Sequence, residues 1–178
     1  MTESFDSLVR AEIILLHDRV TELEREFEDA RTYGEPSDVH RLAPLLDEAR
    51  ERWGDASTMP ALAEAATALY YREGEGWHGL DRCQGALDHL LYRHGGDGMG
   101  FLEVVEASPT RITLVGETWW AVPIDAREGG NLVEATFTFD PNPRAVSGIV
   151  VRAGETVGDG PRNRPETDEQ WAIVIRAP

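Results

Sequence analysis

The sequence contains no lysine, because all 17 of its basic residues are arginine. A chain without lysine cannot form a Schiff base through its own amine, and it cannot supply the lysine of a phosphate-binding loop. Cys83 is the single cysteine, which excludes an internal disulfide and a zinc site made of four cysteines. The sequence therefore excludes enzymes that act through a lysine Schiff base, phosphate-binding loops that require lysine, and zinc sites of four cysteines.

Long apolar runs are also missing. The longest early run, at residues 13–16, is flanked by Glu12, His17 and Asp18, and it falls far short of the roughly 20 residues of a membrane span. The first residues are acidic, whereas a signal peptide begins with basic residues. We therefore predict a cytoplasmic protein that has no membrane contact.

Charge of one sign dominates the composition. The 33 acidic residues against 17 arginines give a net charge of −16. Such an excess repels nucleic-acid phosphates, so the sequence argues against DNA or RNA binding. Two uses of the charge stay open, which are attraction of a basic protein partner and solubility alone.

The strongest periodic signal predicts one long helix over residues 3–31. Its apolar residues follow the alternating spacing of four and three that marks a heptad seam. The seam consists of Val9, Ile13, Leu16, Val20, Leu23 and Phe27. Two packing modes stay open: the seam packs on later helices of its own chain, or it pairs between chains in a homodimer.

Proline and glycine predict three shorter helices after the long one. Residues 43–54 have Pro44 near the start and Gly54 at the end, and residues 57–74 repeat this pattern with Ser57 or Thr58 as cap, Pro60 and Gly74. The third predicted helix covers residues 79–96 and carries an apolar stripe that includes Cys83 and Leu87.

From residue 101 onward the pattern changes to that of strands. Five are predicted, at residues 101–106, 111–122, 131–140, 145–153 and 170–177. Short connections favour an antiparallel, curved sheet, and helices followed by strands define the α+β class. We predict a helical region over 1–96 and a sheet region over 97–178, which form one cooperative domain.

The adjacent tryptophans Trp119 and Trp120 mark the candidate binding surface. Neighbouring strand residues point to opposite faces, so one helical layer cannot cover both indoles. Tryptophan is also enriched at binding hot spots. The full candidate set, for a ligand or a partner, is Trp119, Trp120, Phe137, Phe139, Trp171, His78 and Glu117.

Catalytic and metal-binding patterns are sparse. The spacing of the five histidines gives no pair with a histidine or carboxylate four residues away, so we predict no metal and no cofactor. His78 and Asp81 are three residues apart, which suits either orientation of the imidazole or, more simply, a cap at the start of the helix.

Two functions from different classes remain. We favour a non-catalytic acidic protein-binding module, such as an adaptor, inhibitor, chaperone or immunity-type partner, which holds a basic protein or a second copy of itself. The alternative is a small-ligand pocket protein or enzyme. In its order of helices and sheet the chain resembles the nuclear-transport-factor-like group, and this resemblance implies a cone-shaped sheet around a pocket.

Overall fold

The computed structural model describes residues 4–94, 96–120, 131–155 and 171–176, with the backbone alone at several strand ends and throughout the last strand. It divides into two compact units. Residues 6–57 form the first, here called the helical unit, and residues 1–5 with 58–178 form the second, here called the sheet unit. The boundary lies inside one helix and not between a helical and a sheet region. Whether the chain unfolds as one cooperative domain stays a prediction.

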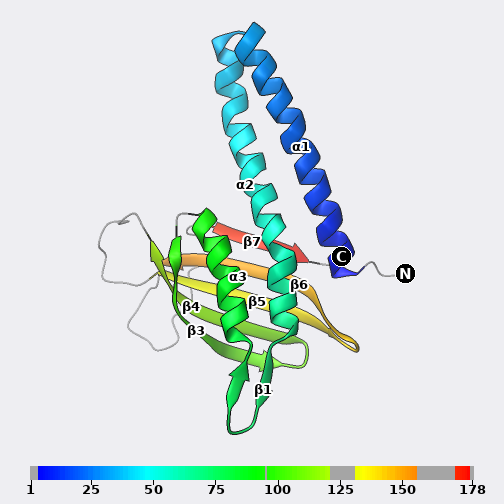
Figure 1. Ribbon diagram of the computed structural model, residues 1–178, viewed down its shortest axis with the longest axis vertical. Helices are drawn as coiled ribbons and strands as arrows, with labels where there is room; N and C mark the ends of the chain where they lie inside the picture. Colours follow the sequence, from blue (N-terminus) through cyan, green and yellow to red (C-terminus); the bar gives the residue numbers. More distant parts are fainter. Residues whose placement is uncertain (1–3, 95, 121–130, 156–170, 177–178) are drawn as a thin grey trace. The chain divides into compact units, whose positions relative to one another are not determined.

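Two antiparallel helices make the helical unit (Figure 1). Helix α1 runs from Phe5 to Tyr33, and α2 runs from Pro36 to Thr67 and continues into the sheet unit. Gly34 ends α1, where its amide donates to the Ala30 carbonyl at 2.9 Å. A side chain at Gly34 would meet the Ala30 backbone at 2.7 Å, so only glycine fits this close approach.

The core of the helical unit lies between the two helices. Val20 and Leu23 of α1 pack with residues of α2, and several half-buried side chains lie against them. The buried members are Val20, Leu23, Leu42, Leu46 and Ala49, and the half-buried ones are Phe27, Ala30 and Trp53. The second half of the predicted seam is therefore covered by the chain's own α2.

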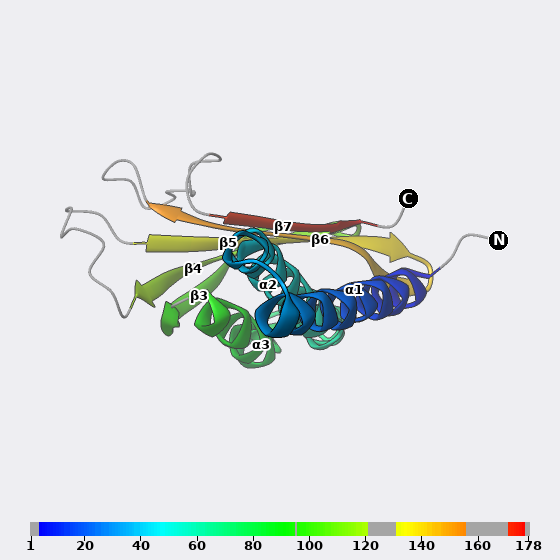
Figure 2. The ribbon, with the colours of Figure 1, turned by 90° about the horizontal axis from the view of Figure 1, so that it is seen from above.

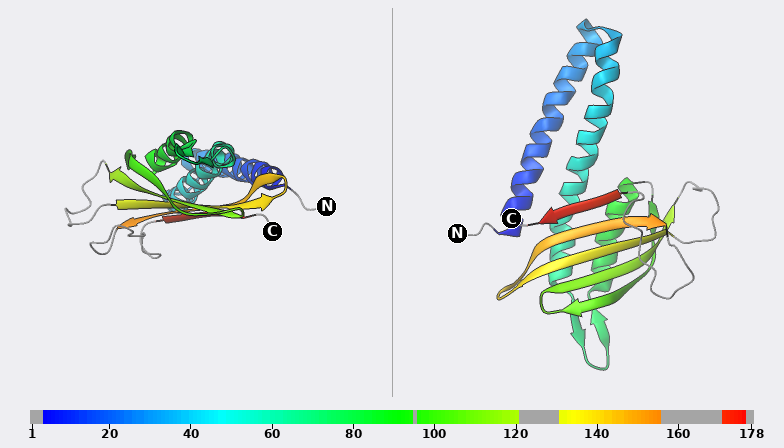
Figure 3. Two further views of the ribbon diagram at one scale, coloured as in Figure 1. Left: turned by 90° about the horizontal axis from the view of Figure 1, so that it is seen from below. Right: turned by 180° about the vertical axis from the view of Figure 1, so that it is seen from behind.

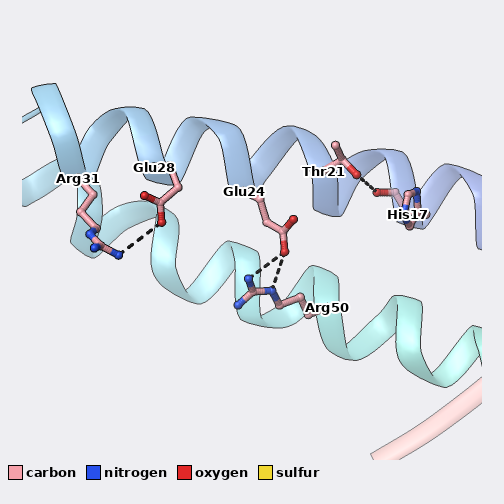
Figure 4. A network of polar contacts seen from close by, with 6 residues as sticks. All are labelled: His17, Thr21, Glu24, Glu28, Arg31 and Arg50. Atoms are coloured by element: carbon pink, nitrogen blue, oxygen red, sulfur yellow. Dashed lines mark hydrogen bonds and ion pairs between the residues drawn. The ribbon is translucent and has the colours of Figure 1, made fainter.

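Polar contacts also link the two helices (Figure 4). Arg50 of α2 donates through Nη2 and Nε to Glu24 Oε1 of α1, at 2.9 and 3.3 Å. The His17 and Trp53 rings lie with centroids 5.3 Å apart. Exposed pairs of this kind contribute at most about 1 kcal/mol each, so the apolar seam provides most of the stability.

Helix α2 corrects the predicted helix boundaries. The sequence predicts separate helices at 43–54 and 57–74, but residues 36–67 form one helix that contains Pro44, Gly54 and Pro60. Within the described residues, three helices therefore take the place of the predicted four. Ser57 does not act as a cap, since its hydroxyl donates to the Trp53 carbonyl at 2.7 Å inside the helix.

Burial explains why α2 continues through its prolines. A proline inside a helix costs about 3 kcal/mol, because it removes a hydrogen bond and crowds the preceding turn. The same helix buries Leu42 and Leu46 in the helical unit and Met59 and Leu62 in the sheet unit. Each such side chain contributes about 1.5–3 kcal/mol, which outweighs the cost of Pro44 and Pro60.

The sheet unit confirms the α+β class and the antiparallel sheet. Its large sheet has the order β3-β4-β5-β6-β7, in which every neighbouring pair is antiparallel. The strands are β3 (Gly96–Ser108), β4 (Arg111–Trp120), β5 (Asn131–Pro141), β6 (Arg144–Glu155) and β7 (Trp171–Arg176). Helix α3 (Leu80–Arg93) lies against one face of this sheet (Figures 1 and 2).

Alternation along β5 defines the two faces of the sheet. Val133, Ala135 and Phe137 are buried on one face, while Glu134 and Thr136 on the other face are half-buried. Helix α3 contributes Cys83, Leu87, Leu90 and Leu91, all of them buried, which confirms the predicted apolar stripe of this helix. The core of the sheet unit is therefore a helix-on-sheet layer.

A second sheet, of two strands, lies outside the five predicted strands. Strands β1 (Tyr70–Arg72) and β2 (Gly76–His78) form an antiparallel hairpin between α2 and α3. The sequence predicts helix as far as Gly74, but α2 ends at Thr67. The hairpin projects past the sheet, away from the body of the sheet unit (Figures 1 and 3).

Candidate interaction surface

The residues predicted as one binding surface lie in different places. Phe137 and Phe139 are buried in the core, whereas Glu117 is exposed and, by strand alternation, lies on the opposite face of the sheet. His78 lies in the β1–β2 hairpin. The side chains of Trp119, Trp120 and Trp171 lie outside the described residues. The structure therefore does not bring the described members of this set together.

The predicted association seam is occupied within the chain along much of its length. Val20, Leu23 and Phe27 contact α2, Val9 is buried, and Ile13 and Leu16 are half-buried. Besides Tyr33 at its C-terminal end, α1 exposes the large apolar residues Ile14 and Leu15, which lie off the seam. A homodimer through the seam stays a prediction, and it would require the α1–α2 packing to open.

The β1–β2 hairpin carries two cross-strand aromatic pairs, one on each face. Tyr70 lies opposite His78 in the strand register, and Tyr71 lies opposite Trp77. The Tyr70 and His78 rings stack with centroids 4.8 Å apart and planes 6° from parallel. The Tyr71 and Trp77 rings meet edge to face, at 5.6 Å and 63°. Such pairs stabilise a hairpin by up to about 1 kcal/mol each.

These rings are open to solvent. The exposed fraction is 48% for Tyr70 and 61% for Tyr71, and Trp77 and His78 are half-buried. A stable hairpin of this size normally needs further strands or a helix to cover one face. Exposed aromatic rings that are grouped on one element are typical of contact surfaces. The hairpin is therefore the strongest candidate interaction surface among the described residues.

The tip of the hairpin is built from glycine and glutamate. Gly74 and Gly76 have φ values of 81° and 85°, a left-handed conformation that favours glycine. Glu75 Oε2 accepts from Arg72 Nη1 at 3.0 Å and lies 3.1 Å from His78 Nε2. Glu75 is thus held by two partners of its own hairpin. This arrangement also corrects the predicted pairing of His78 with Asp81, since α3 begins after Gly79 with no side-chain cap.

A hydrogen bond from β6 holds the base of the hairpin. Leu69 is fully buried, and its carbonyl accepts a hydrogen bond from Arg144 Nη1 at 2.6 Å. The Arg144 guanidinium also lies over the Phe139 ring, 4.5 Å from its centroid. A charged donor on a carbonyl is worth about 1.5–3 kcal/mol. The hairpin is therefore attached at its base to β6 through Arg144.

We expect Arg144→Met to loosen this attachment. The variant keeps the apolar contact of the side chain but removes the hydrogen bond to Leu69 and the cation over Phe139. Unfolding free energy should fall by about 1.5–3 kcal/mol in urea titrations. Hydrogen exchange of residues 69–79 should accelerate more than exchange of β5. Equal acceleration in both segments would argue against a specific role in anchoring the hairpin.

Surface arginines are engaged by carboxylates of their own chain. Besides Arg50 with Glu24, ion pairs join Arg31 to Glu28 at 3.4 Å and Arg41 to Asp38 at 3.8 Å. In residues 6–57, fourteen acids face seven arginines, a net charge of −7. These pairs disperse the positive charge along the helices, and the exposed surface keeps a negative excess.

Cys83 is a core residue and not a reactive thiol. It is fully buried on α3, and this burial, together with the nearby Asp81 carboxylate, raises the pKa of the Cys83 thiol to about 12. The thiol therefore stays protonated at neutral pH. A protonated thiol is a poor nucleophile and a poor metal ligand.

Thiol labelling tests this assignment. At pH 8 the folded protein should hold about 10³-fold less thiolate than the unfolded chain, so it should react with a disulfide reagent at least about 100-fold more slowly. The folded rate should keep rising beyond pH 9, because the pKa lies near 12, whereas the rate in urea should level off. A plateau near pH 9 for the folded protein would contradict the burial of Cys83.

In the part of the chain that the structure describes, none of the helices combines the length and the apolar composition of a membrane span. Among the same residues, no group of three or more histidine, cysteine, aspartate or glutamate side chains is placed to hold a metal ion.

The hairpin has a sequence signal that could have been recognised. The segment "YYREGEGWH" places two aromatic residues on each side of two glycines, and tyrosine and tryptophan favour strands. The helical periodicity of the preceding alanine-rich segment continues into it and predicts helix there instead.

Comparison with known proteins identifies no family for this chain. No family model matches it, and no curated protein or solved structure gives a significant match.

Proposed function

We propose that this protein is a non-catalytic, acidic protein-binding module that contacts a basic partner protein through the β1–β2 hairpin. The observation that carries the proposal is the exposure of Tyr70 and Tyr71 on a hairpin that projects from a firmly attached base. Aromatic side chains on protruding elements supply large contact areas at low entropic cost. Nothing else in the described fold requires these rings to be exposed.

The charge of the chain supports a basic partner. With a net charge of −16, the protein attracts cationic surfaces and repels acidic ones over about a Debye length. Opposite charge speeds association and gives specificity, while aromatic contacts provide the lasting affinity. An adaptor, inhibitor, chaperone or immunity-type role would use this combination, and a cytoplasmic location stays a prediction.

The alternative of a small-ligand pocket has less support. It requires a curved sheet whose concave face carries open aromatic side chains, as the resemblance to the nuclear-transport-factor-like group implies. Phe137 and Phe139, two of the residues assigned to that pocket, are buried in the core. A shallow depression in the helical unit is lined by Leu15, Thr21 and four charged residues of α1, which are Asp18, Arg19, Glu22 and Arg25. This mainly charged lining does not suit an apolar ligand.

Native mass spectrometry tests the proposal. The protein would be captured gently from cells that express it, alongside the double variant Tyr70→Ser with Tyr71→Ser. We expect a complex with a protein whose composition is basic, weakened by salt, and a loss of that complex in the double variant. The double variant should lose no more than about 2 kcal/mol of unfolding free energy, because each cross-strand aromatic pair contributes up to about 1 kcal/mol, and its circular dichroism spectrum should match that of the wild type.

Other masses of the captured complex would support other functions or another contact surface. An increment of a few hundred daltons would support the small-ligand alternative. A doubled mass that persists in the double variant would assign self-association to another surface. If the double variant still binds the basic partner, the protein is a binding module, but the hairpin is not its contact surface.

A further inference from the structure

The Tyr71 face of the hairpin contains a corner suited to a cation. The Tyr71 and Trp77 rings meet at 63°, with centroids 5.6 Å apart. In this edge-to-face pair the edge of one ring lies against the face of the other, and the remaining ring faces are not stacked on each other. A cationic side chain beside the pair can contact one of these negative ring faces, as in the sites by which proteins bind alkylammonium and guanidinium groups. The opposite face differs, because Tyr70 and His78 stack in parallel.

A carboxylate follows β1 directly. Glu73 is the first residue of the turn, two residues after Tyr71 in the chain. Glu73 is exposed and forms no ion pair with the residues that the structure describes, whereas Glu75, across the turn, is held by Arg72 and His78. The two glutamates of the tip therefore have different roles: one fixes the turn and the other offers a negative charge to a partner.

We infer that the corner formed by Tyr71, Trp77 and Glu73, here called the cation corner, binds an arginine or lysine side chain of the partner. This inference rests on the proposed function and adds the chemistry of recognition to it. The two rings supply cation–π attraction, and the Glu73 carboxylate forms a charge-assisted hydrogen bond. The negative charge of the whole chain favours approach of a basic segment.

The choice of a cationic side chain follows from charge complementarity. An acidic side chain would meet Glu73 and the negative ring faces, and both contacts are unfavourable. A purely apolar side chain would cover the rings but leave the carboxylate desolvated without a partner. A cation on a flexible apolar stem satisfies both requirements, since its methylene groups cover the ring edges while its charge lies over the ring faces.

Peptide binding to the full chain tests the cation corner. The probe is an end-blocked, fluorescently labelled peptide of glycine and serine with two arginines, and its matched control replaces arginine by citrulline, which has nearly the same shape but no charge. A lysine version separates guanidinium from ammonium recognition. Binding is measured by fluorescence anisotropy at low and moderate salt. We expect the arginine peptide to bind at least about 10-fold more tightly than the citrulline peptide.

Variants locate the binding. Tyr71→Leu keeps an apolar side chain but removes the π-face, and we expect about 3- to 5-fold weaker binding of the arginine peptide. Tyr71→Phe keeps the π-face and should retain affinity. Glu73→Gln should weaken binding about 2- to 5-fold and reduce its salt dependence. Tyr92→Leu, at an exposed tyrosine on α3, is the matched control and should bind as the wild type does.

Three results would overturn the inference. They are equal binding of the arginine and citrulline peptides, equal affinity of the Tyr71→Leu and Tyr92→Leu variants, and absence of binding at millimolar peptide. Failure here is separable from failure of the proposed function. If Tyr71→Leu and Glu73→Gln keep the natural partner while the double tyrosine-to-serine variant loses it, the hairpin binds a protein without a cation corner. If the peptides bind but no basic partner is captured, the cation corner is supported and the proposed function is contradicted.

Discussion

Replacing Phe137 with alanine will lower the unfolding free energy by about 3–5 kcal/mol, the range for a fully buried phenylalanine. The Phe137 side chain is 0% exposed on the helix-facing side of β5. It lies opposite Ile112 of β4 and Ile149 of β6 in the strand register, so its removal leaves a cavity in the middle of the sheet. Melting temperature should fall by at least about 6 °C in a chain of this size.

Thr138→Ala is the matched control for this prediction. Thr138 is the next residue of the same strand, but it is exposed on the other face, so we expect a change within about 0.5 kcal/mol. Both variants would be measured by urea unfolding with far-UV circular dichroism. If Phe137→Ala proved as stable as the wild type, Phe137 would not be a core residue, and its assignment to a ligand pocket would regain support.

A second large effect is expected in the helical unit. Leu23→Ala should lower unfolding free energy by about 2–5 kcal/mol, because the Leu23 side chain is 2% exposed and packs with Leu42, Leu46 and Ala49 of α2. Leu15→Ala is the control, since Leu15 is 69% exposed on the same helix. Its effect should stay within about 0.5 kcal/mol.

The Leu23 variant also tests two open predictions. If helical and sheet signals lose stability together, the chain unfolds as one cooperative domain; two separate transitions would show that the helical unit unfolds by itself. The unfolding midpoint should not depend on protein concentration, because Leu23 is covered within its own chain. A midpoint that rises with concentration would instead assign the seam to a contact between chains.

The fold class could be predicted because its signals are local. Alternation in residues 131–140 identifies one buried and one wetter face, and the structure buries Ala135 and Phe137 as that pattern requires. The heptad spacing in α1 likewise identifies the side of the helix that becomes buried at Val20 and Leu23. A side chain's face follows from backbone geometry alone, so sequence suffices there.

The candidate site could not be predicted in the same way. The tryptophan pair predicts a binding surface on β4, but the hairpin at residues 70–78 holds the exposed aromatic pairs that the structure describes. Pairing of Tyr71 with Trp77 depends on the register of two short strands. That register is set by the left-handed Gly74 and Gly76 in the turn, and helical periodicity in the residues before it masks the change to strand.

The charge, the absence of lysine chemistry, the α+β class and the buried side of each long element follow from the sequence alone. All of these depend on composition or on spacing along one segment. Tertiary structure alone decided that Pro44 and Pro60 lie inside one helix, that the seam of α1 is covered by α2, and that Tyr70 and Tyr71 stay exposed. In each case a local preference of a few kcal/mol competes with the free energy of burial against residues distant in the chain. Which of the two is larger depends on contacts that exist only in the folded protein.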